Sequence, residues 1–300
     1  MEFDLSWILL GLPVVFALGW FASRLDLRQL RIENRQAPKA YFKGLNHLLN
    51  EQQDQAIDAF IEAVQKDPDT SELHFALGNL FRRRGEYERA VRVHEHLLSR
   101  ADLSQADRDR AQHALALDFL KAGLLDRAED ALRKLEGTPY DEQAGLTLLS
   151  LHERARDWPQ ARAMAQRLQQ SGAGDFTLRL SHYLCEQATE ALNKKKDPAG
   201  ARQHLHQAID EAPGAARPRI ELAGLLARGD QPAQALELLA GLEQHAPQAI
   251  ALVASELVRI GQTAGQAARV RELLERSYAA TPSIDVADAI VQADVAAGVP

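Results

Sequence analysis

The chain has 300 residues, 46% of them hydrophobic, and a formal net charge of −7 at pH 7. This acidic balance argues against general nucleic-acid binding, which needs a basic face, and a single cysteine, Cys185, excludes an intramolecular disulfide. Alanine and leucine dominate the apolar residues, and long alternating β-branched or aromatic runs are missing, so an all-α protein is expected.

The chain opens with a segment that is typical of a membrane anchor. Residues 5–22, LSWILLGLPVVFALGWFA, carry no charge and would span about 27 Å as a helix, close to the thickness of a bilayer's hydrocarbon core. A cleaved signal peptide is the alternative, but the preceding residues Glu2 and Asp4 are acidic and no A-x-A cleavage site follows. Residues 1–23 are therefore predicted to form a single transmembrane helix.

A basic segment, residues 24–36, follows the predicted anchor. Its four arginines lie after the span and none lies before it, so the positive-inside rule places the body in the cytoplasm. Their spacing puts them on one face of a helix, where each charge held against anionic lipid would contribute about 1 kcal/mol. Orientation together with a solvated face is the simpler interpretation, and the two are compatible. The arginines are Arg24, Arg28, Arg31 and Arg35.

Small residues then recur at the period of the tetratricopeptide repeat. Gly44 and Gly78 are 34 residues apart, and so are Ala56 and Ala90. Each repeat is a pair of antiparallel helices that cross closely at such residues, and pairs must stack because one pair cannot bury its own apolar face. Residues 37–300 are therefore predicted to form a tetratricopeptide-repeat solenoid.

The alanine register predicts about seven helix pairs, with longer intervals absorbed by loops. Two such insertions are expected at Ser104–Arg108 and Ser171–Asp175. Residues 283–300 resemble the first helix of an eighth pair without a polar cap, so this last repeat is expected to be incomplete and to continue in the parent protein. The repeat alanines are Ala56, Ala90, Ala128, Ala161, Ala201 and Ala235.

Motifs of catalysis and of cofactor binding are missing from the sequence. It has no phosphate loop, no G-x-G-x-x-G, no H-E-x-x-H and no G-x-S-x-G, so neither an enzyme nor a cofactor is expected. Two histidine pairs are spaced by two residues, on different helix faces, and a third histidine shares a face with the cysteine but has no further ligands. No metal site is therefore expected. These residues are His94 and His96, His204 and His206, and His182 and Cys185.

The best-formed repeat carries the candidate partner-binding residues Phe75, Asn79, Arg82 and Arg83. They lie near the expected concave side of the repeat. Arginine can bind a carboxylate bidentately and asparagine can hold a peptide backbone, so an acidic or extended peptide is the expected ligand. The alternative is that these side chains only solvate a helix end.

Three stretches together with the predicted anchor resemble the lipopolysaccharide assembly protein B family. They are LGNLFRRRGEYERAVRVHEHLL at 77–98, AGLLDRAEDAL at 122–132 and HYLCEQA at 182–188. The resemblance implies a cytoplasm-facing, single-pass inner-membrane adaptor of Gram-negative bacteria. Such a protein promotes degradation of the deacetylase LpxC by the membrane protease FtsH, and works with a lipopolysaccharide-sensing membrane regulator.

Two points remain open beside this resemblance. Family members end in a rubredoxin-like metal-binding domain with two C-x-x-C pairs, and this sequence has neither pair. A general scaffold for another envelope complex, in secretion or division, is the alternative function, and an enzyme with a catalytic part beyond Pro300 is a third. The sequence also leaves a homodimer open.

Overall fold

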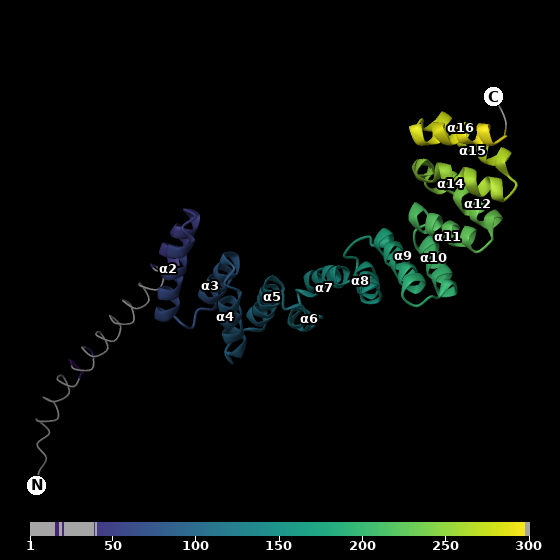
Figure 1. Ribbon diagram of the computed structural model, residues 1–300. Coiled ribbons are helices and arrows are strands. Elements are labelled where there is room, and N and C mark those ends of the chain that lie inside the picture. The colour runs from purple at the N-terminus through teal and green to yellow at the C-terminus, as the bar shows by residue number, and fades with distance from the viewer. Residues whose placement is uncertain (1–15, 18–19, 21–38, 40, 298–300) are drawn as a thin grey trace, which may run out of the picture. The chain divides into compact units, whose positions relative to one another are not determined.

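The structure is a computed structural model that describes residues 16, 17, 20, 39 and 41–297 (Figure 1). All regular secondary structure in this part of the chain is helical. Within it, no helix is both long and apolar enough to cross a bilayer. Apart from residues 16, 17 and 20, the predicted anchor lies outside the described residues, and so does the basic stripe. The stripe consists of Arg24, Arg28, Arg31 and Arg35.

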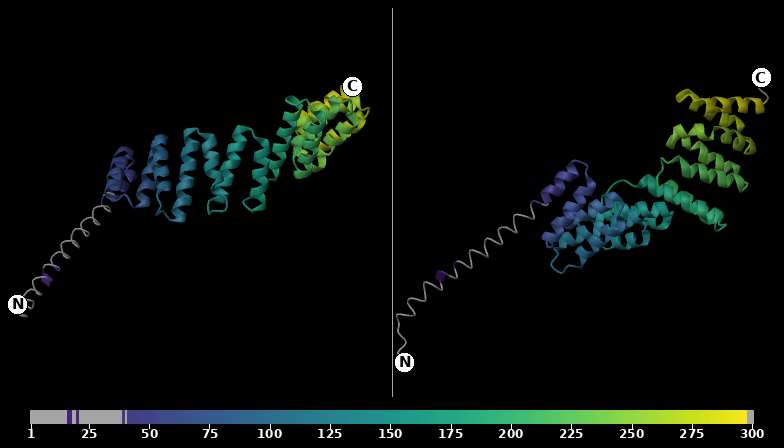
Figure 2. Two further views of the ribbon diagram at one scale, coloured as in Figure 1. Left: turned by 90° about the horizontal axis from the view of Figure 1, so that it is seen from below. Right: turned by 60° about the vertical axis from the view of Figure 1, so that its left-hand side comes forward.

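The chain divides into two compact units, residues 1–144 and 145–300, and each is described by itself. The first unit begins with helical residues 41–49, and each following helix packs against the one before it (Figure 2). Its helices are α2 (Gln53–Lys66), α3 (Ser71–Arg84), α4 (Tyr87–Ser99), α5 (Gln105–Ala122) and α6 (Leu125–Arg133).

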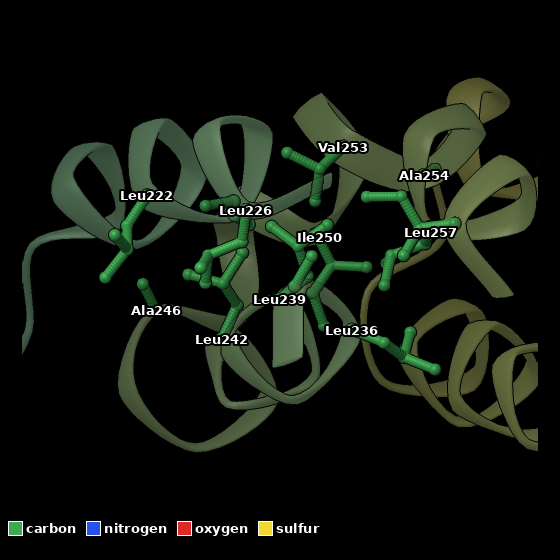
Figure 3. Packing of buried hydrophobic residues seen from close by; sticks show 14 of the residues in the cluster. Leu222, Leu226, Leu236, Leu239, Leu242, Ala246, Ile250, Val253, Ala254 and Leu257 are labelled. Atoms are coloured by element: carbon green, nitrogen blue, oxygen red, sulfur yellow. The ribbon is translucent and has the colours of Figure 1, made fainter. Parts of the chain in front are cut away.

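The second unit contains the helices from α7 onward. Helix α7 begins just before residue 145, where this unit starts. A continuous apolar core runs from α9 to α16, and Figure 3 shows Leu226, Leu239 and Leu242 gathered around Ile250. The helices are α7 (Asp141–Ala155), α8 (Trp158–Gln170), α9 (Thr177–Asn193), α10 (Pro198–Glu211), α11 (Ala216–Arg228), α12 (Pro232–Ala240), α13 (Leu242–His245), η1 (Pro247–Ala249), α14 (Ile250–Thr263), α15 (Ala267–Ala280) and α16 (Ile284–Ala297).

The helices form the predicted pairs. Residues 41–49 with α2, α3 with α4, and α5 with α6 belong to the first unit, and four further pairs belong to the second: α7/α8, α9/α10, α11/α12 and α14/α15. Helix α16 follows as the first helix of a further pair, as expected for residues 283–300. The prediction of an all-helical repeat protein is confirmed for the described residues.

The repeat alanines occupy one structural position. Each is the fourth residue of the second helix of its pair, and each is completely buried. Their single methyl group lets the two helices approach closely, while neighbouring leucines and aromatic rings fill the space on either side. In α15 the fourth residue is Val270, which is also buried. The six alanines are Ala56, Ala90, Ala128, Ala161, Ala201 and Ala235.

Glycines on the first helices complete these close contacts. A Cβ atom on Gly44 would lie 2.7 Å from the ring of Phe60, and one on Gly261 would lie 2.5 Å from Cγ2 of Val270. Contacts this short do not occur between real side chains. Glycine is therefore needed at both positions because a large side chain of the partner helix occupies the space.

The seventh pair exchanges large and small residues relative to the second and third pairs. In the second and third pairs a phenylalanine, Phe81 or Phe119, lies nine positions before the repeat alanine. In α14 and α15 the same positions hold Gly261 and Val270, which touch each other. The larger side chain thus lies on the second helix in this pair, whereas it lies on the first helix in the second and third pairs.

One predicted loop is wrong and another is confirmed. The segment Ser104–Arg108 is not an inserted link, because the hydroxyl of Ser104 accepts a hydrogen bond from the backbone N–H of Asp107 and caps α5. The interval between Ala90 and Ala128 is long because α5 itself has 18 residues. This helix is followed by Gly123 in the left-handed conformation, which ends it. Residues Ser171–Asp175 do lie outside helices, between α8 and α9.

Gly261→Leu should destabilise the chain, and Val270→Ala should rescue it. The leucine would overpack the contact with Val270 at a cost of about 1–3 kcal/mol, whereas the double variant recreates the large–small order of the other pairs. Urea denaturation followed by circular dichroism measures both free energies of unfolding. If the double variant is no more stable than Gly261→Leu alone, the exchange of volumes is not what makes glycine necessary.

Candidate partner-binding site

The four residues predicted to bind a partner all lie on α3, but they have different environments. Phe75 is buried, and it packs against Leu97, Leu103 and Ala111. The guanidinium carbon of Arg110 lies 4.1 Å from its ring centroid. Phe75 is therefore part of the apolar contact between the second and third pairs, and its ring is not available to a peptide.

Arg82 and Asn79 are bonded to each other and to α5. The Arg82 guanidinium donates to the Asp118 carboxylate at 2.7 Å, to the backbone carbonyl of Ala114 at 3.0 Å and to Oδ1 of Asn79 at 2.6 Å. Asp118 is fully buried and the Arg82 side chain is 18% exposed. A carboxylate in the interior needs such partners, because burying an unpaired charge is very unfavourable.

His94 of α4 is the second partner of Asp118. Its Nδ1 lies 2.5 Å from Asp118 Oδ2, and both side chains are fully buried. The imidazole rests on Gly78, where an added Cβ would lie 2.5 Å from the ring. Gly78 thus makes room for His94, and His94 together with Arg82 holds the charge of Asp118 inside the first unit. This Arg82–Asp118–His94 network joins α3, α4 and α5.

Arg83 is the predicted residue that stays accessible. Its side chain is exposed, and it has no hydrogen bond or ion pair within the part of the chain that the structure describes. Its neighbour Arg84 forms ion pairs with Asp54 and Glu86. Of the four predicted residues, Arg83 therefore has a free cationic group on the surface, while Phe75, Asn79 and Arg82 support the helix that carries it.

Other first helices are joined by arginine–carboxylate pairs that are more exposed than the Arg82–Asp118 pair. Arg110 of α5 pairs with Glu72 of α3, and Arg217 of α11 pairs with Glu186 of α9. Arg179 of α9 donates to both carboxylate oxygens of Glu153, at 2.8 Å each. Since these arginines already have partners inside the protein, a ligand would have to compete for them.

Tyr183 shares the carboxylate of Glu153 with Arg179. Its hydroxyl donates a short hydrogen bond to Glu153 Oε1. Burial, and then this bond to Glu153, raises the pKa of Tyr183 well above its ordinary value. The phenol is therefore a permanent hydrogen-bond donor near neutral pH, and it is not an acid–base group.

The residues considered for metal binding do not come together. In the described part of the chain no group of three or more histidine, cysteine or carboxylate side chains has metal-binding geometry. Cys185 is buried, and burial raises its pKa to about 12, so a thiolate does not form near neutral pH. His182 is instead at the surface beside Arg217, so it does not share the environment of Cys185.

Sequence comparison identifies the family. The tetratricopeptide repeat family profile matches residues 192–260. Lipopolysaccharide assembly protein B of Escherichia coli K12 is 31% identical over 275 residues, which cover 91% of this chain and 70% of that protein. The chain belongs to the lipopolysaccharide assembly protein B family. The family protein of Haemophilus influenzae is 30% identical, over 80% of this chain and 63% of its own length.

Solved structures that align with this chain do so at TM-scores below 0.5. A tetratricopeptide repeat protein from Parabacteroides merdae aligns with a TM-score of 0.43 and 12% identity, covering 86% of this chain and 99% of that one. The family assignment of this member rests on the curated relatives and not on this likeness.

The Asp118→Asn variant should be much less stable than a matched surface variant. The change leaves the partly buried Arg82 beside a neutral amide, and breaking a buried pair of this kind costs about 3 kcal/mol. Asp54→Asn also removes one partner of an arginine, Arg84, but both side chains are exposed, so a loss of no more than about 1 kcal/mol is expected. Equal losses in urea denaturation would contradict a supporting role for the network.

Proposed function

We propose that this chain is a non-enzymatic, membrane-tethered adaptor. It would regulate lipopolysaccharide biosynthesis by promoting degradation of the deacetylase LpxC by the membrane protease FtsH. The observation that carries the proposal is the 31% identity to lipopolysaccharide assembly protein B over 91% of this chain. The stacked helix pairs suit it, because such arrays present extended surfaces to protein partners.

In this proposal residues 1–23 anchor the protein in the inner membrane as a single-pass helix. The basic segment 24–36 lies against anionic lipid, and the repeat array 37–300 lies in the cytoplasm. An anchor confines the array to the surface where a membrane protease and a lipopolysaccharide-sensing regulator also reside. Confinement raises their effective concentration without any new contact.

The network around Asp118 would give the adaptor a rigid presenting helix. Arg82, Asn79 and Phe75 fix α3 against α5, and Arg83 extends from the same helix with its charge unpaired. An acidic segment of LpxC or FtsH could pair with Arg83 without first breaking an internal ion pair. The binding surface is therefore proposed at the end of α3, with Arg83 as its direct contact.

Depletion of the protein tests the function. The half-life of LpxC and the amount of lipopolysaccharide should both rise when the protein is depleted, and both should return on re-expression. A chain without residues 1–23, expressed at the native level, should fail to shorten the LpxC half-life because it lacks the tether. An unchanged LpxC half-life on depletion, with defects in secretion or division, would support the general envelope scaffold instead.

Arg83→Glu should weaken capture of LpxC or FtsH without changing the free energy of unfolding. Reversal of the charge repels an acidic segment, and Arg83 makes no internal pair whose loss would destabilise the fold. Lys121→Glu is the matched control, since Lys121 is also exposed and next to last in its helix, α5. Pull-down from membranes by the two variants measures the effect. Equal capture by Arg83→Glu and wild type would remove Arg83 from the interface.

A further inference from the structure

The exposed face of the first helix carries two large apolar side chains. In the helical residues 41–49, Phe42 is 65% exposed and Leu49 is 82% exposed. Because they are seven residues apart, both side chains project from the same face of the helix. Single exposed apolar residues are common on protein surfaces, but two that share a helix face form a patch and point to a partner.

This face ends the repeat array within the part of the chain that the structure describes. Ala76 and Leu80 of α3 hold the equivalent positions of the second pair, 34 residues after Phe42 and Asn46. Both pack in an apolar cluster that includes Ile57 of α2, so the first pair covers that face of the second. Among the described residues no earlier helix pair covers Phe42 and Asn46 in this way.

The same face also carries polar side chains. Asn46 and Asn50 are exposed, and the Asn50 amide donates a hydrogen bond to the backbone carbonyl of Asn46 at 2.9 Å. A further helix pair packed over this face would remove both amides from water, which is unfavourable without new hydrogen bonds. The face therefore suits a partner that is apolar in one part and hydrated in another, such as the boundary of a bilayer.

The charge of this segment is positive, in contrast to the chain as a whole. Residues 39–50 contain two lysines and one histidine but no aspartate or glutamate, whereas the net charge of the chain is −7. Lys43 is exposed and forms no ion pair with the described residues. The nearby Glu62 carboxylate is bonded to Lys66 at 2.7 Å, which is the main reason that the pKa of Glu62 is lowered, and Lys43 contributes least. This segment is therefore suited to an anionic surface.

The position of the segment in the chain brings it close to the membrane under the proposed function. In that proposal residues 24–36 lie against anionic lipid, and the helix of residues 41–49 starts five residues after their end. Five residues reach about 18 Å at most, so the helix begins close to the lipid surface. The bilayer is therefore a partner of suitable charge that is always within reach of this face.

We propose that this face docks on the head-group region of an anionic bilayer. Phe42 and Leu49 enter the boundary between head groups and acyl chains, as the apolar side chains of interfacial helices do. Lys43 pairs with lipid phosphates, while Asn46 and Asn50 remain hydrated among the head groups. The docking rests on the proposed membrane anchor and is independent of the partner contact proposed on α3. It would hold the first helix pair at a fixed position on the membrane, which the anchor alone does not do.

A fluorophore at residue 49 tests the docking in the 300-residue chain. Cys185 is completely buried, so Leu49→Cys provides a single accessible thiol for the environment-sensitive dye NBD. In nanodiscs of phosphatidylglycerol and phosphatidylcholine, the emission of the dye should shift to shorter wavelength and should be quenched by lipids with brominated acyl chains. Leu124→Cys is the control, since Leu124 is also an exposed leucine of the first unit but lies between α5 and α6. The dye at residue 124 should emit as in water.

Two substitutions on the face test its apolar part and its charged part. Phe42→Ser should reduce the quenching at residue 49, because less apolar surface enters the bilayer. Lys43→Gln should lower the ratio of docked to undocked array about fivefold, since one lysine near anionic lipid contributes about 1 kcal/mol. Lys121→Gln, at an exposed lysine of α5, should leave this ratio unchanged. Equal effects of the two lysine variants would overturn the proposal, because the attraction would then be diffuse.

The remaining outcomes separate the docking from the anchor. A chain that stays in the nanodiscs while its dye at residue 49 emits as in water overturns the docking and leaves the anchor in place. A chain that does not associate with nanodiscs contradicts both. A shift to shorter wavelength without quenching by brominated lipid means that protein covers the face, either residues 24–36 or a second copy of this chain, and overturns the proposal. So does an equal response at residue 124.

Discussion

The packing of this array depends on positions where two helices approach each other closely. The residue at such a position is alanine or glycine, because a larger side chain would keep the helices apart. Dispersion contacts act only over short distances, so helices held apart by a larger residue would lose much of their packing. In the second pair Ala90 and Phe81 belong to one buried cluster, and in the third pair Ala128 and Phe119 are both buried. In the seventh pair Gly261 of the first helix lies against Val270 of the second, so the small residue can lie on either helix.

Periodicity therefore revealed the repeat architecture in advance, because steric exclusion at the crossing acts on single residues at a fixed spacing. The extent of each helix was harder to predict. The sequence predicts an inserted link from Ser104 to Arg108, but Ser104 caps α5 and the residues after it belong to that helix. The prediction was wrong because a serine hydroxyl can either interrupt a helix or cap its start. Which it does depends on whether the following residues find a surface to pack on, and that surface comes from α4.

The roles of the candidate site residues could be predicted from the sequence only in part. Arg82 and Arg83 are adjacent and chemically identical, so helix position alone gave them one role. Their difference comes from Asp118, which lies 36 residues after Arg82 and reaches it only when α5 packs on α3. One local signal was available: a charged residue directly before the core residue Phe119, at a position that faces the interior. A buried carboxylate of this kind predicts a cationic partner, although it does not identify which one.

The arginines among the described residues thus include two kinds, which differ in the interactions that a ligand would have to displace. Arg82 and Arg271 have carboxylate partners inside the fold, so an external anion would have to displace those carboxylates and would gain little net free energy. Arg83 is exposed and has no ion pair among the described residues, so an anion bound there would add an interaction without removing one. Recognition by a helical array of this kind should therefore concentrate where the repeating pattern of internal ion pairs is interrupted, and those interruptions become visible only once every pair in the array has been located.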